Sequence, residues 1–89
     1  MKTIEFSPKV YKKLQSLRRT DKKIYQKIIK QLDLFQANPH HKSLRLHKIK
    51  RGKDNIWSIS IDEGYRMLYI EDETIYFFDI GTHDEVYKK

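Results

Sequence analysis

The fold of this chain is decided by residues 57–69, which read WSISIDEGYRMLY. From Trp57 to Asp62 the residues alternate between apolar and small or polar, the period-2 pattern of a half-buried strand. Glu63-Gly64 then predicts a turn, and residues 65–70 predict a second strand. Two strands joined by so short a turn are expected to pair as an antiparallel hairpin.

Further strands are expected on both sides of this hairpin. Downstream, Asp72-Glu73 predicts a turn into residues 75–80, a continuous apolar run typical of a central strand that is covered on both faces. Upstream, the alternation in residues 44–51 predicts another strand, which a turn at residues 52–55 connects to the hairpin. Strands so closely spaced are expected to form an antiparallel meander.

The first part of the chain predicts a short strand at residues 3–6 and then two helices. Ser7-Pro8 provides an N-cap followed by proline at the first helical position, and Asn38-Pro39 ends the second helix. Thr20 or Asp21 is expected to cap the second helix. The apolar positions at helical spacing are Val10, Leu14 and Leu17, then Ile24, Ile28, Leu32 and Phe35. The element order β-α-α-β-β-β-β predicts an α+β fold, with the N-terminal helical hairpin packed on one face of a mainly antiparallel sheet and the other face partly open.

The composition limits the kind of protein. The sequence has 89 residues and no cysteine, which excludes a disulfide or a cysteine-based zinc site. It also lacks the run of about 18 apolar residues that a membrane span requires. We expect one domain over residues 1–89, soluble and cytoplasmic, without a signal peptide and without a membrane partner.

The basic residues are concentrated in the first part of the chain. The formal net charge is +7. Residues 1–55 hold 16 basic and 4 acidic side chains, whereas residues 56–89 hold 3 basic and 8 acidic ones. This asymmetry favours a basic surface for a polyanion or for an acidic partner. The alternative is that lysine-rich helices simply have solvated outer faces.

Three short motifs occur in order along the chain: Phe6–Val10 before the helical hairpin, residues 57–69 with their Tyr65-Arg66 pair, and IGTHDEVY at residues 80–87. Together they resemble toxins of the RelE/ParE superfamily of type II toxin–antitoxin systems, and the ending resembles that of the YafQ-like branch. The resemblance implies a toxin that a cognate antitoxin holds inactive. It implies cleavage of mRNA on the ribosome in the RelE and YafQ-like branches, and inhibition of DNA gyrase in the ParE branch. The antitoxin is expected to be acidic or to carry an acidic helix.

The resemblance also implies a set of catalytic residues. His83 matches the histidine of the YafQ-like ending and is predicted to be the general acid of a metal-independent endoribonuclease. His47 matches an upstream histidine, as general base or substrate positioner, and Arg66 matches an arginine that would hold the scissile phosphate. Tyr87 matches a terminal aromatic residue that stacks a base or assists proton transfer.

Each of these matches leaves a structural alternative open. The two histidines could be plain surface residues. Arg66 could instead form a salt bridge with Asp62 or Asp79, and Tyr87 could simply dock the C-terminal tail on the core. In the YafQ-like branch a second histidine and an acidic–aromatic pair stand where this chain has Ser60, Gly64 and Tyr65. Only the aromatic one of these positions keeps its chemical type.

A second set of residues is predicted to bind RNA, namely Arg45, Lys48, Lys50, Arg51 and Tyr65. In a regular strand Lys48 and Lys50 share one face, and His47 and Arg51 take the other. His40-His41 are expected in a loop, because two adjacent histidines cannot readily bind one metal and no third ligand is suitably spaced. No metal or other cofactor is predicted.

The sequence therefore predicts the toxin of a type II toxin–antitoxin system that acts as an mRNA endoribonuclease, with mRNA, the ribosome and an antitoxin as partners. Two alternatives on the same fold remain open. One is a ParE-like inhibitor of DNA gyrase, which needs no catalytic residues. The other is a non-catalytic basic module that binds nucleic acid.

Overall fold

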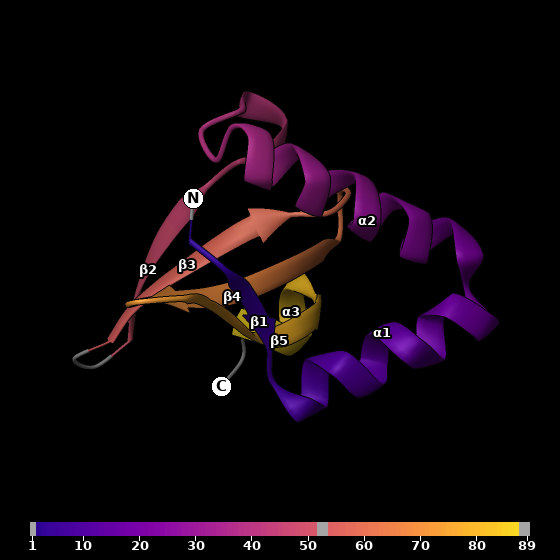
Figure 1. Cartoon of the computed structure of the whole chain (residues 1–89). Helices are drawn as coiled ribbons and strands as arrows, with labels where there is room; N and C mark the ends of the chain where they lie inside the picture. Colours follow the sequence, from indigo (N-terminus) through magenta and orange to yellow (C-terminus); the bar gives the residue numbers. More distant parts are fainter. Residues whose placement is uncertain (1, 52–53, 88–89) are drawn as a thin grey trace.

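The computed structural model describes residues 2–51 and 54–87, without the side chains of residues 50, 51 and 54. The elements, shown in Figure 1, are β1 (Ile4–Phe6), α1 (Pro8–Thr20), α2 (Lys22–Ala37), the short 3₁₀ helix η1 (Lys42–Leu44), β2 (His47–Arg51), β3 (Asp54–Ser60), β4 (Tyr65–Glu71), β5 (Ile75–Thr82) and α3 (His83–Tyr87). The predicted order β-α-α-β-β-β-β and the α+β class are confirmed, and η1 and α3 are additional elements.

The strands form one sheet in the order β1-β5-β4-β3-β2. β2 to β5 pair as the predicted antiparallel meander, and β1 pairs with β5 in parallel. Within the meander, His47 lies opposite Ser58, and Ser58 lies opposite Leu68. The sheet therefore aligns the start of β2 with the middle of β3 and β4.

The helical hairpin begins and turns where the sequence predicts. Ser7 caps α1, since its Oγ accepts a hydrogen bond from the Val10 amide at 3.1 Å. Asp21 ends α1 and also caps α2, because its carboxylate accepts a hydrogen bond from the Ile24 amide at 3.2 Å. Asn38 is the C-cap of α2, directly before Pro39.

The main hydrophobic core lies between this hairpin and one face of the sheet. Its helix residues are the predicted ones, including Val10, Ile28 and Phe35, which are 0–1% exposed. The Phe35 ring packs edge-on against Tyr69 at 5.2 Å and Phe77 at 5.8 Å between ring centroids. Burial, together with the nearby Glu71 carboxylate, raises the pKa of Tyr69 to about 12. The aromatic residues thus fix the hairpin on the sheet.

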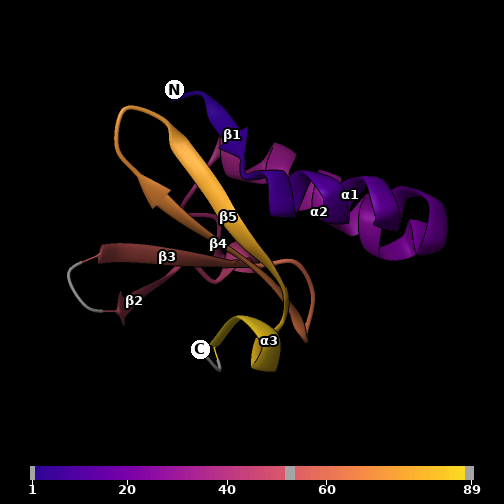
Figure 2. The ribbon, with the colours of Figure 1, turned by 90° about the horizontal axis from the view of Figure 1, so that it is seen from below.

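The opposite face of the sheet carries a smaller cluster. Ile56 and Leu68 pack there against Val86 of α3, and all three are buried. Figure 2 shows the hairpin and α3 on opposite sides of the sheet. The sequence predicts this face to be partly open, and the structure adds a short helix that covers part of it. The prediction of a half-buried strand is wrong at Ser58 and Ser60, which are both buried.

Two predicted boundaries around β2 are also wrong. The strand expected from Leu44 begins only at His47, because Leu44 ends η1 and Arg45 has a left-handed backbone with φ 45°. In the turn expected at residues 52–55, Asp54 already belongs to β3, and residues 52–53 lie outside the described part of the chain.

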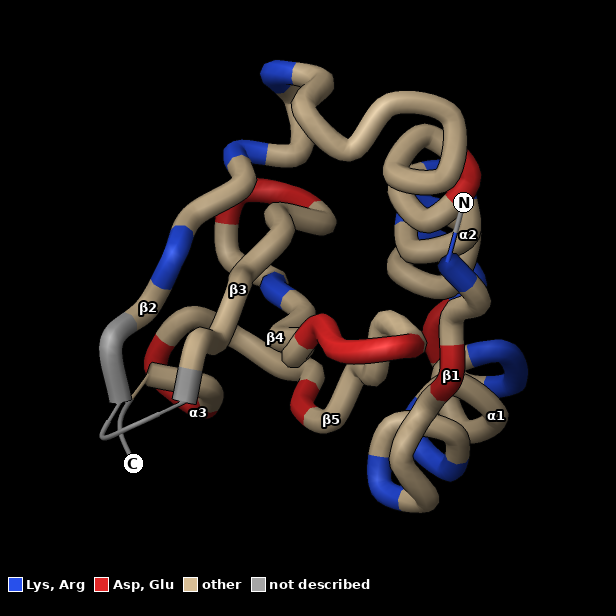
Figure 3. The backbone as a smooth tube through the Cα atoms, turned by 60° about the vertical axis from the view of Figure 1, so that its left-hand side comes forward, with Lys and Arg blue, Asp and Glu red and all other residues tan. Residues whose placement is uncertain are grey.

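The described helices and strands separate the charges in space. Figure 3 shows basic residues on α1, α2 and β2, and acidic residues around the connections on either side of β4. Within residues 2–51 and 54–87, no helix is both long enough and apolar enough to cross a membrane.

Candidate active site on the face opposite the helical hairpin

A cavity of about 490 Å³ opens between β2, β4 and α3, on the sheet face away from the hairpin. Its lining residues are Arg45, His47, Ile49, Arg66, His83 and Tyr87. All four predicted catalytic residues are in this set, together with one predicted RNA-binding residue. The meander and α3 thus bring to one place residues that range from position 45 to position 87 in the sequence.

His83 reaches the cavity as the first residue of α3. β5 ends at Thr82, and the His83 amide donates a hydrogen bond to the Gly64 carbonyl at 2.9 Å, which anchors the backbone at the β3–β4 turn. The imidazole side chain is 59% exposed, and its Nδ1 lies 3.7 Å from an Asp84 carboxylate oxygen. The ring is therefore accessible to a ligand in the cavity.

Tyr87 holds the other end of α3 on the sheet. Its hydroxyl donates a hydrogen bond to the Oγ of buried Ser58 at 2.7 Å. Its ring lies edge-on to the His83 ring, with 4.3 Å between centroids. The docking role considered for Tyr87 is therefore present in the structure, and the same ring also lines the cavity and supports His83.

Arg66 lies in β4, on the same face as Leu68 and opposite Gly81 of β5. Its Nε is buried and, among the described side chains, is the one buried polar atom without a hydrogen-bond partner. Each carboxylate considered as its structural partner is engaged by a lysine. Asp62 lies 3.6 Å from Lys27, and Asp79 lies 2.8 Å from Lys9. Arg66 also lines the cavity, where its guanidinium group favours an anionic ligand.

The start of β2 supplies the other wall. His47 and Ile49 are on the strand face that turns toward the cavity. Arg45 precedes the strand in the left-handed conformation, which costs a residue with a side chain about 1–2 kcal/mol. Strain of this kind is often retained where it places a functional side chain. Here it brings a second arginine to the cavity.

Two of the remaining predicted RNA-binding residues, Lys48 and Tyr65, do not line the cavity. Lys48 lies with its ammonium group 5.7 Å from the centre of the Trp57 ring, on the hairpin side of the sheet. Tyr65 packs against the main core, where burial and then the Glu85 carboxylate raise its pKa. The side chains of Lys50 and Arg51 lie outside the described part of the chain.

The cavity therefore combines two imidazoles, two guanidinium groups and one phenol, without a carboxylate among its lining residues. Imidazoles exchange protons near neutral pH, and guanidinium groups bind phosphate oxygens. Such a site is suited to a phosphodiester. Within the described ranges, no three His, Asp or Glu side chains gather closely enough to hold a metal ion.

Sequence reasoning missed two parts of this site. Ser58, the partner of Tyr87, was expected on an exposed face. No helix was predicted at residues 83–87, although Thr82 to Glu85 has the T-x-x-E pattern of a helix-capping box. That pattern is the sequence signal that predicts α3.

Comparison with known proteins defines the class of this molecule as a toxin of a toxin–antitoxin system in the RelE/ParE superfamily. The chain belongs to the family of ParE toxins of the type II toxin–antitoxin system parDE, whose family model matches residues 4–87. It is 37% identical to the RelE4 protein of Methanocaldococcus jannaschii over 95 aligned positions, which cover 100% of this chain and 94% of that protein.

Solved structures of such toxins share the fold. YoeB in the YoeB–YefM complex of Staphylococcus aureus superposes with a TM-score of 0.75 at 22% identity, over 93% of this chain and 98% of that one. YafQ of Escherichia coli superposes with a TM-score of 0.74 at 15% identity, over 98% and 99% of the two chains. The arrangement of two helices on a mainly antiparallel sheet is therefore that of these toxins.

Proposed function

We propose that this toxin is an endoribonuclease that cleaves mRNA in the cytoplasm, on the ribosome, at the cavity between β2, β4 and α3. The observation that carries the proposal is the convergence of His47, Arg66 and His83 on that one cavity. A protein that only inhibits by binding has no need of two titratable imidazoles beside two arginines. Cleavage of RNA without a metal needs a base, an acid and cations that stabilise the phosphorane, and this combination can supply all three.

The cleavage step uses the two histidines on opposite sides of the phosphate. His47 takes the proton of the ribose 2′-hydroxyl, and the 2′-oxygen then bonds to phosphorus. The P–O5′ bond breaks, and protonated His83 gives its proton to the departing 5′-oxygen. The products are a 2′,3′-cyclic phosphate and a 5′-hydroxyl end. Proton transfers of this kind contribute about 10²–10⁴-fold each to the rate.

The arginines neutralise the charge that develops on the phosphorane. Arg66 lines the cavity, and its guanidinium group would bind a phosphate oxygen there. Arg45, which precedes β2, lines the same cavity and would bind the adjoining phosphate. Tyr87 fixes the His83 ring edge-on and offers the rest of its own ring for contact with a base.

A second candidate function is inhibition of DNA gyrase, because the family whose model matches this chain is that of the ParE toxins of parDE systems. A ParE-like inhibitor of DNA gyrase would change DNA supercoiling and leave mRNA intact. A basic module without activity would do neither. The three functions therefore separate in one experiment.

The experiment is controlled expression in a bacterial host, with mRNA decay and plasmid supercoiling followed in the same culture. We expect rapid loss of mRNA, abolished by His83→Ala and preserved by His40→Ala, which alters an exposed histidine in the loop after α2. Altered supercoiling with intact mRNA would overturn the proposal in favour of gyrase inhibition. Equal toxicity of both variants would also overturn it, because toxicity would not depend on the cavity.

We also propose that a cognate antitoxin with an acidic segment binds this toxin. The support is the net charge of +7 and the fold shared with YoeB, which is seen in complex with YefM. Charge complementarity makes such an association sensitive to salt. An antitoxin segment with a net positive charge would contradict this account.

A further inference from the structure

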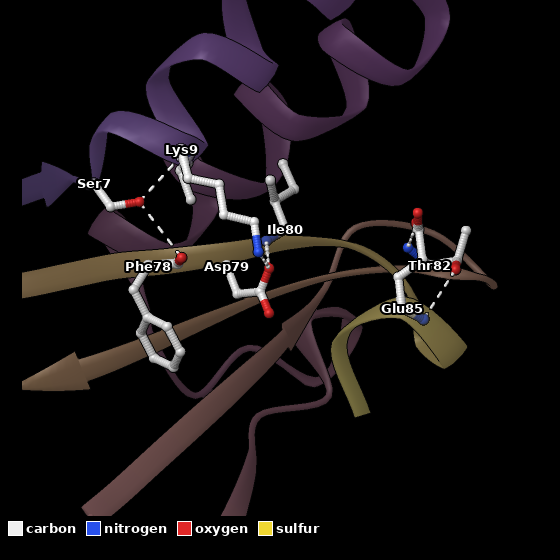
Figure 4. Close-up of polar contacts among 8 residues, drawn as sticks. Ser7, Lys9, Phe78, Asp79, Ile80, Thr82 and Glu85 are labelled. Carbon is white, nitrogen blue, oxygen red and sulfur yellow. Dashed lines mark hydrogen bonds and ion pairs between the residues drawn. The ribbon is translucent and has the colours of Figure 1, made fainter. Parts of the chain in front are cut away.

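The short helix α3 is held at its start by a reciprocal pair of hydrogen bonds, shown in Figure 4. The Thr82 amide donates to Glu85 Oε1 at 2.8 Å, and the Glu85 amide donates to Thr82 Oγ1 at 3.3 Å. This is a capping box, in which two backbone amides at a helix start are satisfied by each other's side chains. Glu85 thus closes the first turn of α3 back onto the end of β5.

Gly81 makes room for this arrangement. A Cβ atom at that position would lie 2.8 Å from Glu85 Oε1 and 3.2 Å from Glu85 Cβ. Gly81 is needed here for space rather than for an unusual backbone angle, because a methyl group would displace the carboxylate from the Thr82 amide. Gly81 lies within β5, opposite Arg66.

The capping box matters because α3 is too short to be stable alone. A helix of five residues lies far below the length at which isolated helices form. Its other anchors are the hydrogen bond from the His83 amide to the Gly64 carbonyl at its start, and buried Val86 and the Tyr87–Ser58 hydrogen bond near its C-terminal end. The His83 side chain, at the N-terminal end, is mostly exposed, so its position depends on the backbone that the capping box and the Gly64 hydrogen bond hold.

Glu85 faces away from the candidate active site. With Lys12 and Lys13 of α1 it lines a groove of about 530 Å³ on the other side of α3, a groove that also contains the Lys9–Asp79 ion pair. The carboxylate therefore does not line the candidate active site, and any effect that it has on cleavage passes through α3.

We propose that Glu85, together with Thr82 and Gly81, is a positioning unit that holds His83 at the cavity. The catalytic task of His83 rests on the proposed nuclease function, whereas the positioning of its side chain by Glu85 does not. Glu85 sets where the imidazole stands, and His83 performs the proton transfer.

The test compares Glu85→Ala with Glu85→Gln in the full chain, with Glu73→Ala as a control that removes the same charge from the β4–β5 turn. Glutamine keeps an oxygen acceptor for the Thr82 amide, as capping boxes allow. Amide hydrogen exchange reports the closure of α3. The NMR shifts of the His83 ring protons report whether the Tyr87 ring still lies beside them.

We expect Glu85→Ala to speed exchange of the α3 amides by roughly tenfold, the effect of losing one good helix cap. The His83 ring shifts should move toward those of an unstructured peptide. For RNA cleavage, kcat should fall and KM should stay, because the two cavity arginines are untouched. Glu85→Gln and Glu73→Ala should match the wild type in all three measurements.

Gly81→Ala provides a second route to the same result. It should loosen α3 as much as Glu85→Ala, and the double variant should be no worse than either single one, since both remove the same contact. A circular dichroism spectrum that matches the wild type would establish that the sheet is intact.

The proposal is overturned if Glu85→Ala leaves α3 exchange and the His83 shifts unchanged. It is also overturned if α3 loosens while kcat stays at the wild-type value in a toxin whose cleavage depends on His83. A wild-type protein that cleaves no RNA would contradict the proposed nuclease function alone. Exchange and NMR would then still decide whether Glu85 holds His83 at the cavity.

Discussion

The two faces of the sheet differ in what they bury and in what they expose. The face under the hairpin carries a continuous core with three mutually packed aromatic rings, Phe35, Tyr69 and Phe77. The described hydrophobic cluster of the opposite face is smaller, with Ile56, Leu68 and Val86 buried and a cavity beside them. One face therefore supplies most of the apolar burial that stabilises the fold, and the other presents groups that can do chemistry.

The basic side chains are also divided unequally between the hairpin and the cavity face. Residues 8–37, which form the helical hairpin, hold nine basic and two acidic side chains, and this equals the whole net charge of +7. Most of the net basic charge therefore lies on the helical hairpin, away from the cavity. The cavity itself has two basic side chains, Arg45 and Arg66, among its lining residues.

The largest effect on stability is expected under the hairpin. Phe35→Ala removes a ring that is 1% exposed and touches two other aromatic rings. It should lower the free energy of unfolding by about 3–5 kcal/mol. Chemical denaturation measures this directly. The corresponding change on the other face is Val86→Ala. It should speed hydrogen exchange of the α3 amides and shift the unfolding midpoint far less than Phe35→Ala does. Equal losses from both variants would contradict the division between the two faces.

The next largest effect is expected in the cavity, at Arg66. Arg66→Met keeps the volume of the side chain and removes its donors, so RNA cleavage should fall by about 10²–10³-fold, as for other lost transition-state donors. Thermal stability should stay level or rise, because the change also removes the buried Nε that has no partner. Cleavage assays and melting curves on one preparation check both statements. A large loss of stability would instead show that the guanidinium is structural.

The sequence predicted the hairpin face better than the cavity face. Helix periodicity, Ser7-Pro8 and Asn38-Pro39 are local signals, and each one placed an element boundary correctly. The position of His47 opposite Ser58, beneath Tyr87, depends instead on strand register and on the docking of α3. Strand register and helix docking are tertiary features, and the alternation of residues along one strand cannot predict them.

Single residues show the same limit. Alternation correctly placed Lys48 and His47 on opposite faces of the strand. It could not predict that the Lys48 ammonium group would lie over the Trp57 ring. No propensity predicts a left-handed arginine at position 45, because glycine or asparagine is the usual residue there. The family resemblance named four residues that the structure brings to one cavity, and their chemical roles remain predictions.

A smaller effect is expected at Arg45, where stability and function oppose each other. Arg45→Ala and Arg45→Gly both remove the charge, and both should raise the KM for RNA. Only glycine also relieves the left-handed conformation, so Arg45→Gly should be more stable than Arg45→Ala by about 1 kcal/mol. Comparing the two melting curves isolates the strain from the charge. Identical curves would mean that the backbone at this position is not strained.

The smallest expected effect is a dependence of α3 on acid pH. The hydrogen bonds from Thr82 lower the pKa of Glu85 below its ordinary value of 4.5, with Lys13 adding to the decrease and Asp79 opposing it. A carboxylate with a lowered pKa contributes stability that is present above pH 4.5 and is lost as the pH falls through the lowered pKa.

The α3 amides should therefore exchange faster, relative to the core, as the pH falls below 4.5. The His83–Asp84 pair and the Lys9–Asp79 pair lie close by. The difference between the wild type and Glu85→Gln isolates the Glu85 contribution, because glutamine keeps the acceptor and cannot be protonated in this range. The same acid-induced loosening in both proteins would show that another group controls α3. Loosening in the wild type alone would show that the helix carrying His83 depends on the ionised Glu85 side chain, on the face of α3 turned away from the candidate active site.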